Sequence, residues 1–286
     1  MKKLSKFFNG IIGTIIIYLA LYYGGAVLIS KVLTYVDTSG LSDGWNSLMV
    51  NYFPVGVLGL IFALFMALFD KASFKTMLPG YGNNGAKSAI GGLLAGLVCN
   101  GGLIIIALLT GHIRLSYSGM GIGFAICAIL IVSFQCIAEE VMDRIFLYQR
   151  FKNAKGHTLA IILSAIFFSA MHIPNMIIFH AGTLTTILGL LNIVLIGIFF
   201  AETVHYGNTT WFAFGFHSAW NFCQNFICGL PNSGLPASAS VLKTVFESDG
   251  LTYDTVFGIE ASVTSVALSA ILIAVTIYMG RKKEKN

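Results

Sequence analysis

Hydrophobic residues in this chain are grouped into repeated runs of about 20, the length that a helix needs to cross a bilayer. Shorter stretches rich in glycine, proline and polar residues separate the runs. Because backbone polar groups inside lipid must be hydrogen-bonded within the chain, such runs predict helices. The pattern predicts about eight membrane-spanning helices, at about 10–30, 51–69, 88–110, 120–149, 157–174, 183–204, 209–229 and 261–280.

The composition agrees with this pattern. Hydrophobic residues make up 56% of the chain and charged residues 10%, whereas soluble domains are about a quarter charged. We therefore predict an all-α fold, a polytopic membrane helical bundle that forms a single integral membrane domain over residues 1–286. The five cysteines lie in or at the ends of hydrophobic runs without metal-type clustering, so no disulfide framework is predicted.

Basic residues predict the orientation in the lipid bilayer. With eight spans, only Lys31, Arg114 and Lys243 fall on one side of the membrane. We therefore expect both termini in the cytoplasm, and the net charge of +5 describes flanks that face lipid rather than a nucleic-acid-binding surface. The basic residues on the predicted cytoplasmic side are Lys2, Lys3, Lys6, Lys71, Lys75, Lys87, Arg150, Lys152, Lys155, Arg281, Lys282, Lys283 and Lys285.

The fourth predicted span contains a cluster of charged residues between two hydrophobic stretches. Such charges are costly in a membrane and are expected to face the interior of the bundle. Glu140 and Arg144 are four residues apart and can pair, which leaves Glu139, rotated by about 100°, without that partner. A free carboxylate beside a neutralised one suits general-base chemistry, and the alternative is an ion-paired seam without chemistry. Asp143 is expected on the face of Glu139, with one of these two carboxylates protonated at neutral pH.

Two further spans carry polar side chains that are expected at a comparable depth. His172 follows Phe168 by one helical turn, and His217 precedes Asn221 by one turn. Either pair alone would be explained by helix packing. Counted from the predicted cytoplasmic ends at about 1.5 Å per residue, Glu139, His172 and His217 lie about 16, 22 and 13 Å deep. The three helices are therefore expected to bring a carboxylate and two imidazoles together.

These side chains suit two kinds of hydrolytic chemistry. In one, Glu139 and His172 activate a water molecule while His217 and Asn221 donate to the developing oxyanion. In the other, glutamate and histidine bind a divalent metal such as zinc, which activates the water. The chain has no His-Glu-x-x-His, Gly-x-Ser-x-Gly or Gly-x-Gly-Asp motif, so zincin-type, serine-hydrolase and presenilin-like aspartyl sites are disfavoured.

The order of the motifs resembles that of a known family, the CAAX protease and bacteriocin-processing intramembrane endopeptidases. The resemblance covers about residues 120–230, the predicted catalytic core. It implies hydrolysis of a peptide bond in a membrane-associated peptide or small protein, for peptide processing or bacteriocin self-immunity, in the plasma membrane of a bacterium. The motifs are Glu139-Glu140-x-x-x-Arg144, Phe168-x-x-x-His172 and His217-x-x-x-Asn221.

Carried over by position, the resemblance implies that Glu139 is the base assisted by His172, that His217 and Asn221 form the oxyanion site, and that no cofactor is needed. Glu140 and Arg144 would support the structure around them. The chain departs from the family at Asp143 and Ile145, where an apolar or aromatic residue and a glycine are common.

Two non-enzymatic functions remain open. One is a membrane immunity or regulatory protein that binds a bacteriocin or a sensor kinase, and the other is a transporter with a polar site in mid-membrane. We further expect Gly92 and Gly96 to allow close helix packing. Glu202 and His205 are expected at the membrane interface rather than in the central cavity.

Overall fold

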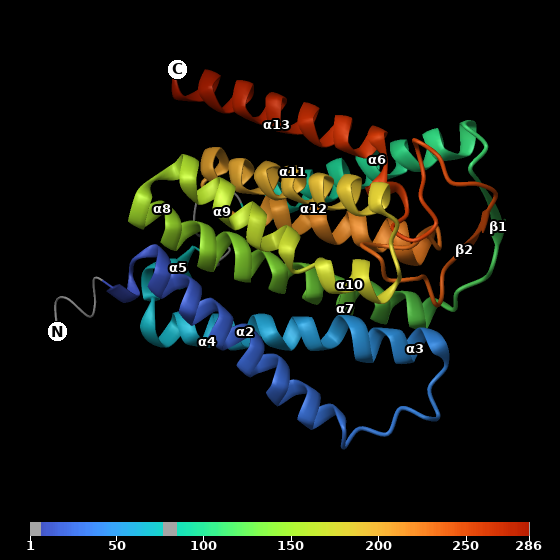
Figure 1. Cartoon of the computed structure of the whole chain (residues 1–286), viewed down its shortest axis with the longest axis horizontal. Coiled ribbons are helices and arrows are strands. Elements are labelled where there is room, and N and C mark those ends of the chain that lie inside the picture. Colours follow the sequence, from blue (N-terminus) through green and yellow to red (C-terminus); the bar gives the residue numbers. More distant parts are fainter. Residues whose placement is uncertain (1–6, 77–84, 286) are drawn as a thin grey trace.

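The chain forms a bundle of long helices that run back and forth between two ends (Figure 1). A computed structural model describes residues 7–76 and 85–285, so the predicted cytoplasmic residues Lys2, Lys3 and Lys6 lie outside the described residues. The helices are α2 (Ile11–Leu33), α3 (Asp43–Ser47), α4 (Phe53–Phe69), α5 (Lys71–Lys75), α6 (Gly85–Leu109), α7 (Ile122–Glu140), α8 (Gln149–Lys155), α9 (His157–Ala170), α10 (Ile173–Ile178), α11 (Thr183–Gly207), α12 (Trp211–Asn221) and α13 (Val263–Glu284).

Short segments with a different helical pitch extend several of these helices. The π-helical segments are η1 (Leu48–Tyr52), η2 (Val141–Tyr148) and η3 (Phe222–Ile227), and η4 (Ile259–Ala261) is a 3-10 turn. The segment η1 connects α3 to α4, η2 connects α7 to α8, and η3 continues α12.

The predicted membrane bundle is confirmed. Within the described part of the chain, seven helices are long and apolar enough to cross a bilayer: Ile11–Leu33, Asp43–Phe69, Gly85–Leu109, Ile122–Lys155, His157–Ile178, Thr183–Gly207 and Val263–Glu284. The remaining predicted span, 209–229, is helical over α12 and η3, which is shorter than the others. Most of its side chains are buried, so it is an inner helix of the bundle and packs against α6.

The two described ends of the chain lie at the same end of the bundle (Figure 1). This arrangement agrees with an even number of traversals. Which end faces the cytoplasm stays a prediction from the basic residues.

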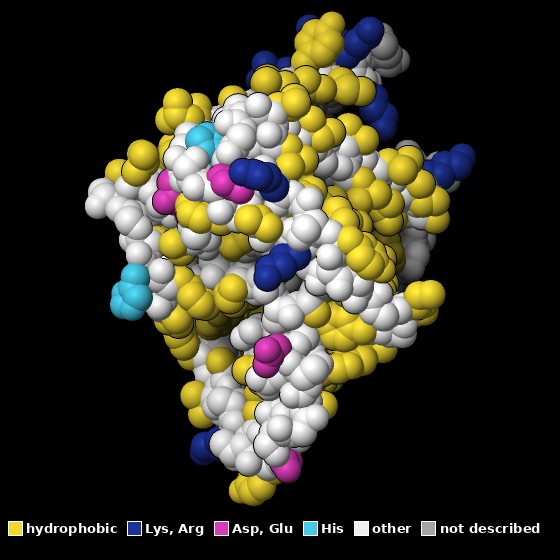
Figure 2. Space-filling model, turned by 90° about the vertical axis from the view of Figure 1, so that its right-hand side faces the viewer, with side chains coloured by type: hydrophobic (Ala, Val, Ile, Leu, Met, Phe, Trp, Pro, Cys, Tyr) yellow, Lys and Arg dark blue, Asp and Glu magenta, His cyan; other side chains and the backbone are white. Residues whose placement is uncertain are grey.

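A small sheet at the other end of the bundle was not predicted. Strand β1 (Ile113–Tyr117) pairs antiparallel with β2 (Leu242–Phe246), with Ile113 opposite Phe246 and Tyr117 opposite Leu242. These strands come from connections far apart in the sequence, so a local hydrophobic pattern does not reveal their pairing. Figure 2 views this end, where charged side chains of both signs lie among polar surface, with hydrophobic side chains along the margins.

Two hydrophobic clusters flank the charged segment of α7 and η2. One cluster joins α2, α4 and η2 through residues such as Tyr18, Phe62 and Phe146. The other joins α6, α11 and α12 through residues such as Phe199 and Phe216. The charged segment therefore lies between two tightly packed apolar regions.

Helix α6 approaches α12 closely because glycines line the contact. A Cβ atom added at Gly92 would lie 2.0 Å from the carbonyl oxygen of Phe212, and one added at Gly96 would lie 2.5 Å from that of Phe216. The predicted role of these glycines in helix packing is confirmed. Since His217 follows Phe216 on α12, this contact also positions a predicted site residue.

Replacing Gly92 by alanine is expected to separate these helices, because its methyl group would meet backbone atoms of Phe212. Overpacking of this kind costs about 1–3 kcal/mol. Thermal unfolding in detergent, followed with a thiol-reactive dye that reports exposure of buried cysteines, should show a lowered Tm. Gly91→Ala on the same helix is the matched control, since nothing lies within 4 Å of the added Cβ. Equal Tm values for the two variants would contradict the packing argument.

Candidate active site

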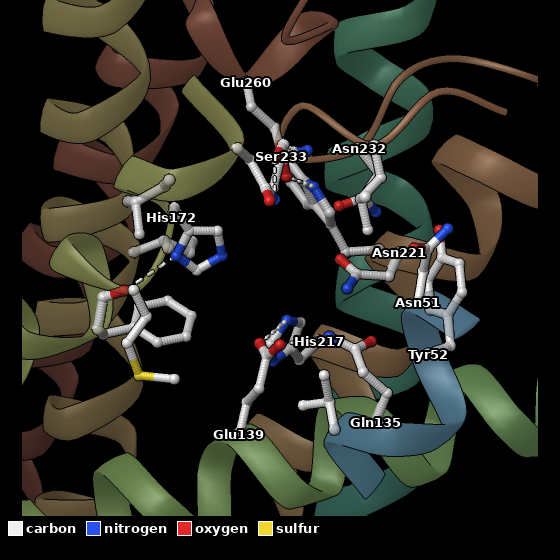
Figure 3. Close-up of a pocket in the computed structure, with 18 of the residues that line it drawn as sticks. Asn51, Tyr52, Gln135, Glu139, His172, His217, Asn221, Asn232, Ser233 and Glu260 are labelled. Carbon is white, nitrogen blue, oxygen red and sulfur yellow. Dashed lines mark hydrogen bonds and ion pairs between the residues drawn. The ribbon is translucent and has the colours of Figure 1, made fainter. Parts of the chain in front are cut away.

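The predicted catalytic residues surround one cavity between the helices (Figure 3). Its volume is about 280 Å³, and its lining includes Glu139 from α7, His172 from the α9–α10 junction, and His217 and Asn221 from α12. These residues are separated by up to 82 positions in the chain. The structure therefore brings all of the predicted catalytic residues together, while their catalytic roles stay a prediction.

Glu139 lies near the end of α7, with its side chain in the cavity and 9% of its surface exposed. Its Oε1 accepts a hydrogen bond from Nε2 of Gln135, one helical turn earlier. Its Oε2 lies 3.6 Å from Nε2 of His217. The carboxylate is therefore oriented on one side by an amide and faces an imidazole on the other.

His172 lies at a break between two helices, not within a continuous helix as its predicted span 157–174 implied. Helix α9 ends at Ala170, and α10 begins at Ile173 with Pro174 in its first turn. Proline fits that position because it has no N–H to donate. Nδ1 of His172 lies 2.9 Å from the carbonyl oxygen of Phe168. A carbonyl oxygen only accepts, so Nδ1–H donates and Nε2 is left for the cavity.

His217 contacts both glutamates of the motif. Its Nδ1 lies 3.1 Å from Oε1 of Glu140, and because a carboxylate accepts, Nδ1–H donates there. This bond turns Nε2 toward Glu139, and the ring stacks on Phe200 at 5.5 Å between centroids. Asn221 lies one turn further along the same helix and lines the same cavity.

The ring of Phe168 contacts several of these side chains. Its ring makes edge contacts with His172 and His217, at centroid distances of 5.2 and 6.1 Å. The guanidinium of Arg144 lies 4.3 Å from the centre of the same ring and 5.2 Å from that of Phe200. These cation–π contacts stabilise the positive charge of Arg144, which is buried away from water.

A buried cluster of charged side chains, Glu140, Asp143 and Arg144, lies next to the cavity. The predicted pair of Glu140 and Arg144 is confirmed, with 3.2 Å between Oε2 and Nε. Asp143 lies 4.0 Å from Nη1 of Arg144, and all of these side chains are essentially inaccessible. Asp143 is not among the residues that line the cavity, and its expected place on the face of Glu139 stays a prediction. The helix changes to π pitch at Val141, and its wider turn alters which positions share a face.

The other π-helical segments also adjoin the cavity. The segment η1 supplies Asn51 and Tyr52 to its lining, and η3 begins directly after Asn221. Interruptions with i→i+5 hydrogen bonds are frequent at functional sites.

Among residues 7–76 and 85–285, no group of three or more histidine, cysteine, aspartate or glutamate side chains is placed to hold a metal ion. The metal-dependent mechanism stays an alternative to the metal-free one.

Glu202 and His205 lie outside the cavity, in a cluster with His157. Oε2 of Glu202 is 3.4 Å from Nε2 of His157, and the ring of His205 stacks on that of His157 at 3.7 Å. Neither residue lines the cavity. They are therefore suitable controls for substitutions of the cavity residues.

Several lining residues were missed by sequence reasoning. Gln135 lies four positions before Glu139, so its helical spacing could have identified it. Trp220 and Glu260 also line the cavity, and their contact depends on a loop that folds back onto α12. The remaining missed polar residues are Tyr22, Asn51, Tyr52, Asn175, Asn192, Asn232 and Ser233.

All three motifs thus converge on one cavity within a membrane bundle. Residues 121–223 match the family model of the type II CAAX prenyl endopeptidases, Rce1-like. The Rce1-like segment begins just before α7 and includes all four predicted catalytic residues. The match confirms the family resemblance and supports an intramembrane endopeptidase of the CAAX type. No curated protein and no solved structure gave a significant match to the chain.

Replacing Arg144 by glutamine is expected to destabilise the protein strongly, because Glu140 and Asp143 would remain buried without their cation. Breaking a buried pair in this way costs about 3–5 kcal/mol. Arg114→Gln is the control: this arginine pairs with Glu247 at the surface, with 77% of its side chain exposed. Exposed pairs contribute about 0–1 kcal/mol. Thermal unfolding in detergent should separate the two variants, and similar Tm losses would refute the assignment.

Proposed function

We propose that this protein hydrolyses a peptide bond in a membrane-associated peptide or small protein. The observation that carries the proposal is the meeting of Glu139, His172, His217 and Asn221 around one cavity inside the bundle. The match of residues 121–223 to the Rce1-like family supports peptide hydrolysis as the reaction class. The resemblance to bacterial members supports a location in a bacterial plasma membrane, with peptide processing or bacteriocin self-immunity as the role.

The first step uses Glu139 as a general base. Glu139 and Nε2 of His172 hold a water molecule, and Glu139 accepts its proton as the oxygen attacks the substrate carbonyl carbon. The hydrogen bond from Gln135 keeps the Glu139 carboxylate directed into the cavity. The hydrogen bond from His172 to the Phe168 carbonyl fixes the tautomer that leaves Nε2 able to accept from water.

The second group of residues stabilises the charge that develops on the carbonyl oxygen. Nε2–H of protonated His217 and the side-chain amide of Asn221 donate to this oxyanion. Glu140 accepts from Nδ1 of His217 and so holds the ring in position. Collapse of the tetrahedral intermediate breaks the C–N bond, and the proton held by Glu139 passes to the leaving amine.

The remaining cavity lining suits a peptide backbone. Carboxamide side chains can donate and accept hydrogen bonds at the same time, as peptide groups do. Asn51, Asn175, Asn192 and Asn232 present such groups around the cavity. We infer that they bind an extended peptide segment whose backbone groups would otherwise be unpaired inside the membrane.

Substitution of the proposed base tests the mechanism. Glu139→Gln and His172→Ala are expected to reduce hydrolysis of a quenched fluorescent membrane-peptide library by about 10²–10⁴-fold, while peptide binding survives Glu139→Gln. Glu202→Gln and His205→Ala are the matched controls, since both residues lie outside the cavity. Purified protein in detergent should be assayed with and without a chelator, and activity is expected to be unchanged by the chelator.

Three results would change this conclusion. Full activity of Glu139→Gln would exclude Glu139 as the base. Loss of activity with chelator and its recovery with zinc would require a metal site instead. Binding of peptides without cleavage by the wild type would favour the alternative of a non-catalytic immunity or regulatory protein.

A further inference from the structure

Glu260 is a buried carboxylate at the cavity that the proposed reaction does not use. It lies on η4, directly before α13, and 7% of its surface is exposed. Figure 3 shows Glu260 across the cavity from Glu139. The residue lies outside the segment 121–223 that matches the Rce1-like family.

The Glu260 carboxylate joins two segments of the chain. Oε1 accepts a hydrogen bond from Nε1 of Trp220, at 3.1 Å. Oε2 accepts from both the backbone N–H and the hydroxyl of Ser233, at 2.5 and 2.9 Å. Trp220 directly precedes Asn221 on α12, and Ser233 belongs to the loop 228–241 between η3 and β2. Glu260 therefore ties this loop to the helix that carries His217.

A further hydrogen bond extends the connection to His172. The carbonyl oxygen of Ser233 accepts from Nδ2 of Asn175, at 2.9 Å. Asn175 lies on α10, three residues after His172. These hydrogen bonds therefore connect α10, which follows His172, to α12, which carries His217, by way of Ser233 and Glu260.

Two glycines allow the segments joined by these hydrogen bonds to lie close together. Gly258 has φ +70°, and a Cβ atom there would lie 2.4 Å from the carbonyl oxygen of Pro231. Gly234 has φ +87°, and its added Cβ would lie 3.1 Å from that of Asn175. Since side chains at these positions would be both strained and crowded, glycine allows the two loops and α10 to meet.

Burial raises the pKa of Glu260 above its ordinary value, and the hydrogen bonds that its oxygens accept from Ser233 and Trp220 offset only part of this shift. Tyr52 of η1 lines the same cavity. Trp220 and Ser233 donate to both oxygens of Glu260, whereas the side-chain amide of a glutamine has only one accepting oxygen.

We propose that Glu260 is a positioning residue, whose carboxylate holds the segment of His172 and the helix of His217 at a fixed separation across the cavity. The kinetic consequence rests on the proposed hydrolytic function. The structural link through Ser233 and Trp220 does not depend on catalysis and can be measured without substrate.

Hydrogen exchange tests the link directly. Glu260→Gln preserves the shape of the side chain but replaces an accepting oxygen by an NH₂ group, so at least one hydrogen bond from Ser233 or Trp220 is lost. The full-length variant in detergent should show faster amide exchange in peptides that cover 229–236 and 172–178. Glu247→Gln is the matched control, because Glu247 belongs to the same connection but pairs with Arg114 at the surface.

The kinetic test uses the same variants and the peptide library. Glu260→Gln is expected to lower kcat by about 10–10²-fold with little change in KM, because a misplacement of about 1 Å can reduce a rate by about 10²-fold. Ser233→Ala removes the hydroxyl donor alone and should give a smaller decrease. Glu260→Asp, which keeps the charge, should retain more activity than Glu260→Gln.

The outcomes are distinguishable. Exchange rates equal to those of the wild type would overturn the link, and faster exchange with unchanged kcat would overturn the positioning role. If the wild type cleaves no peptide, the proposed hydrolysis fails, and hydrogen exchange alone decides whether Glu260 holds the two segments together. If Glu260→Gln does not fold, Ser233→Ala provides the same comparison with the other two hydrogen bonds to Glu260 preserved.

Discussion

A charged side chain inside an apolar bundle must find its counter-charge within the protein, and the structure depends on this requirement at Arg144. Arg144 pairs with Glu140 and lies against the rings of Phe168 and Phe200. Glu140 in turn accepts from His217. One buried cation thus connects α7 and η2 with α9, α11 and α12, so the interaction that neutralises the charge also aligns the helices that line the cavity.

Departures from regular α-helix lie next to the residues that line the cavity. The break after α9 places His172 beside the cavity, and the π-helical segments follow Glu140 and Asn221. Irregular backbone is tolerated at membrane depth where protein surrounds it or where it lines a cavity. The first condition holds here, since the residues of the π-helical segments η2 and η3 are mostly buried. The helices therefore lose their regular hydrogen-bonding pattern close to the cavity, where polar groups must converge.

The cavity is completed by segments outside the long helices. Ser233 and Glu260 contact α10 and α12 from the end of the bundle that also carries β1 and β2. The family match stops at residue 223, before these segments begin. The motif residues and the loops thus contribute differently: the helices supply the reactive groups, and the loops contact and connect the helices that carry them.

The sequence by itself determined the membrane bundle, the approximate limits of its helices and the motif residues, because hydrophobic run length and helical spacing are local properties. The i,i+4 spacing also predicted the Glu140–Arg144 pair. Tertiary structure alone decided that His172 lies at a helix break, that Asp143 is not among the residues that line the cavity and that β1 pairs with β2. It also brought Glu260 to Trp220, forty positions away. These features arise from contacts between distant segments and from changes in helical pitch, which a periodic pattern of hydrophobic residues does not encode.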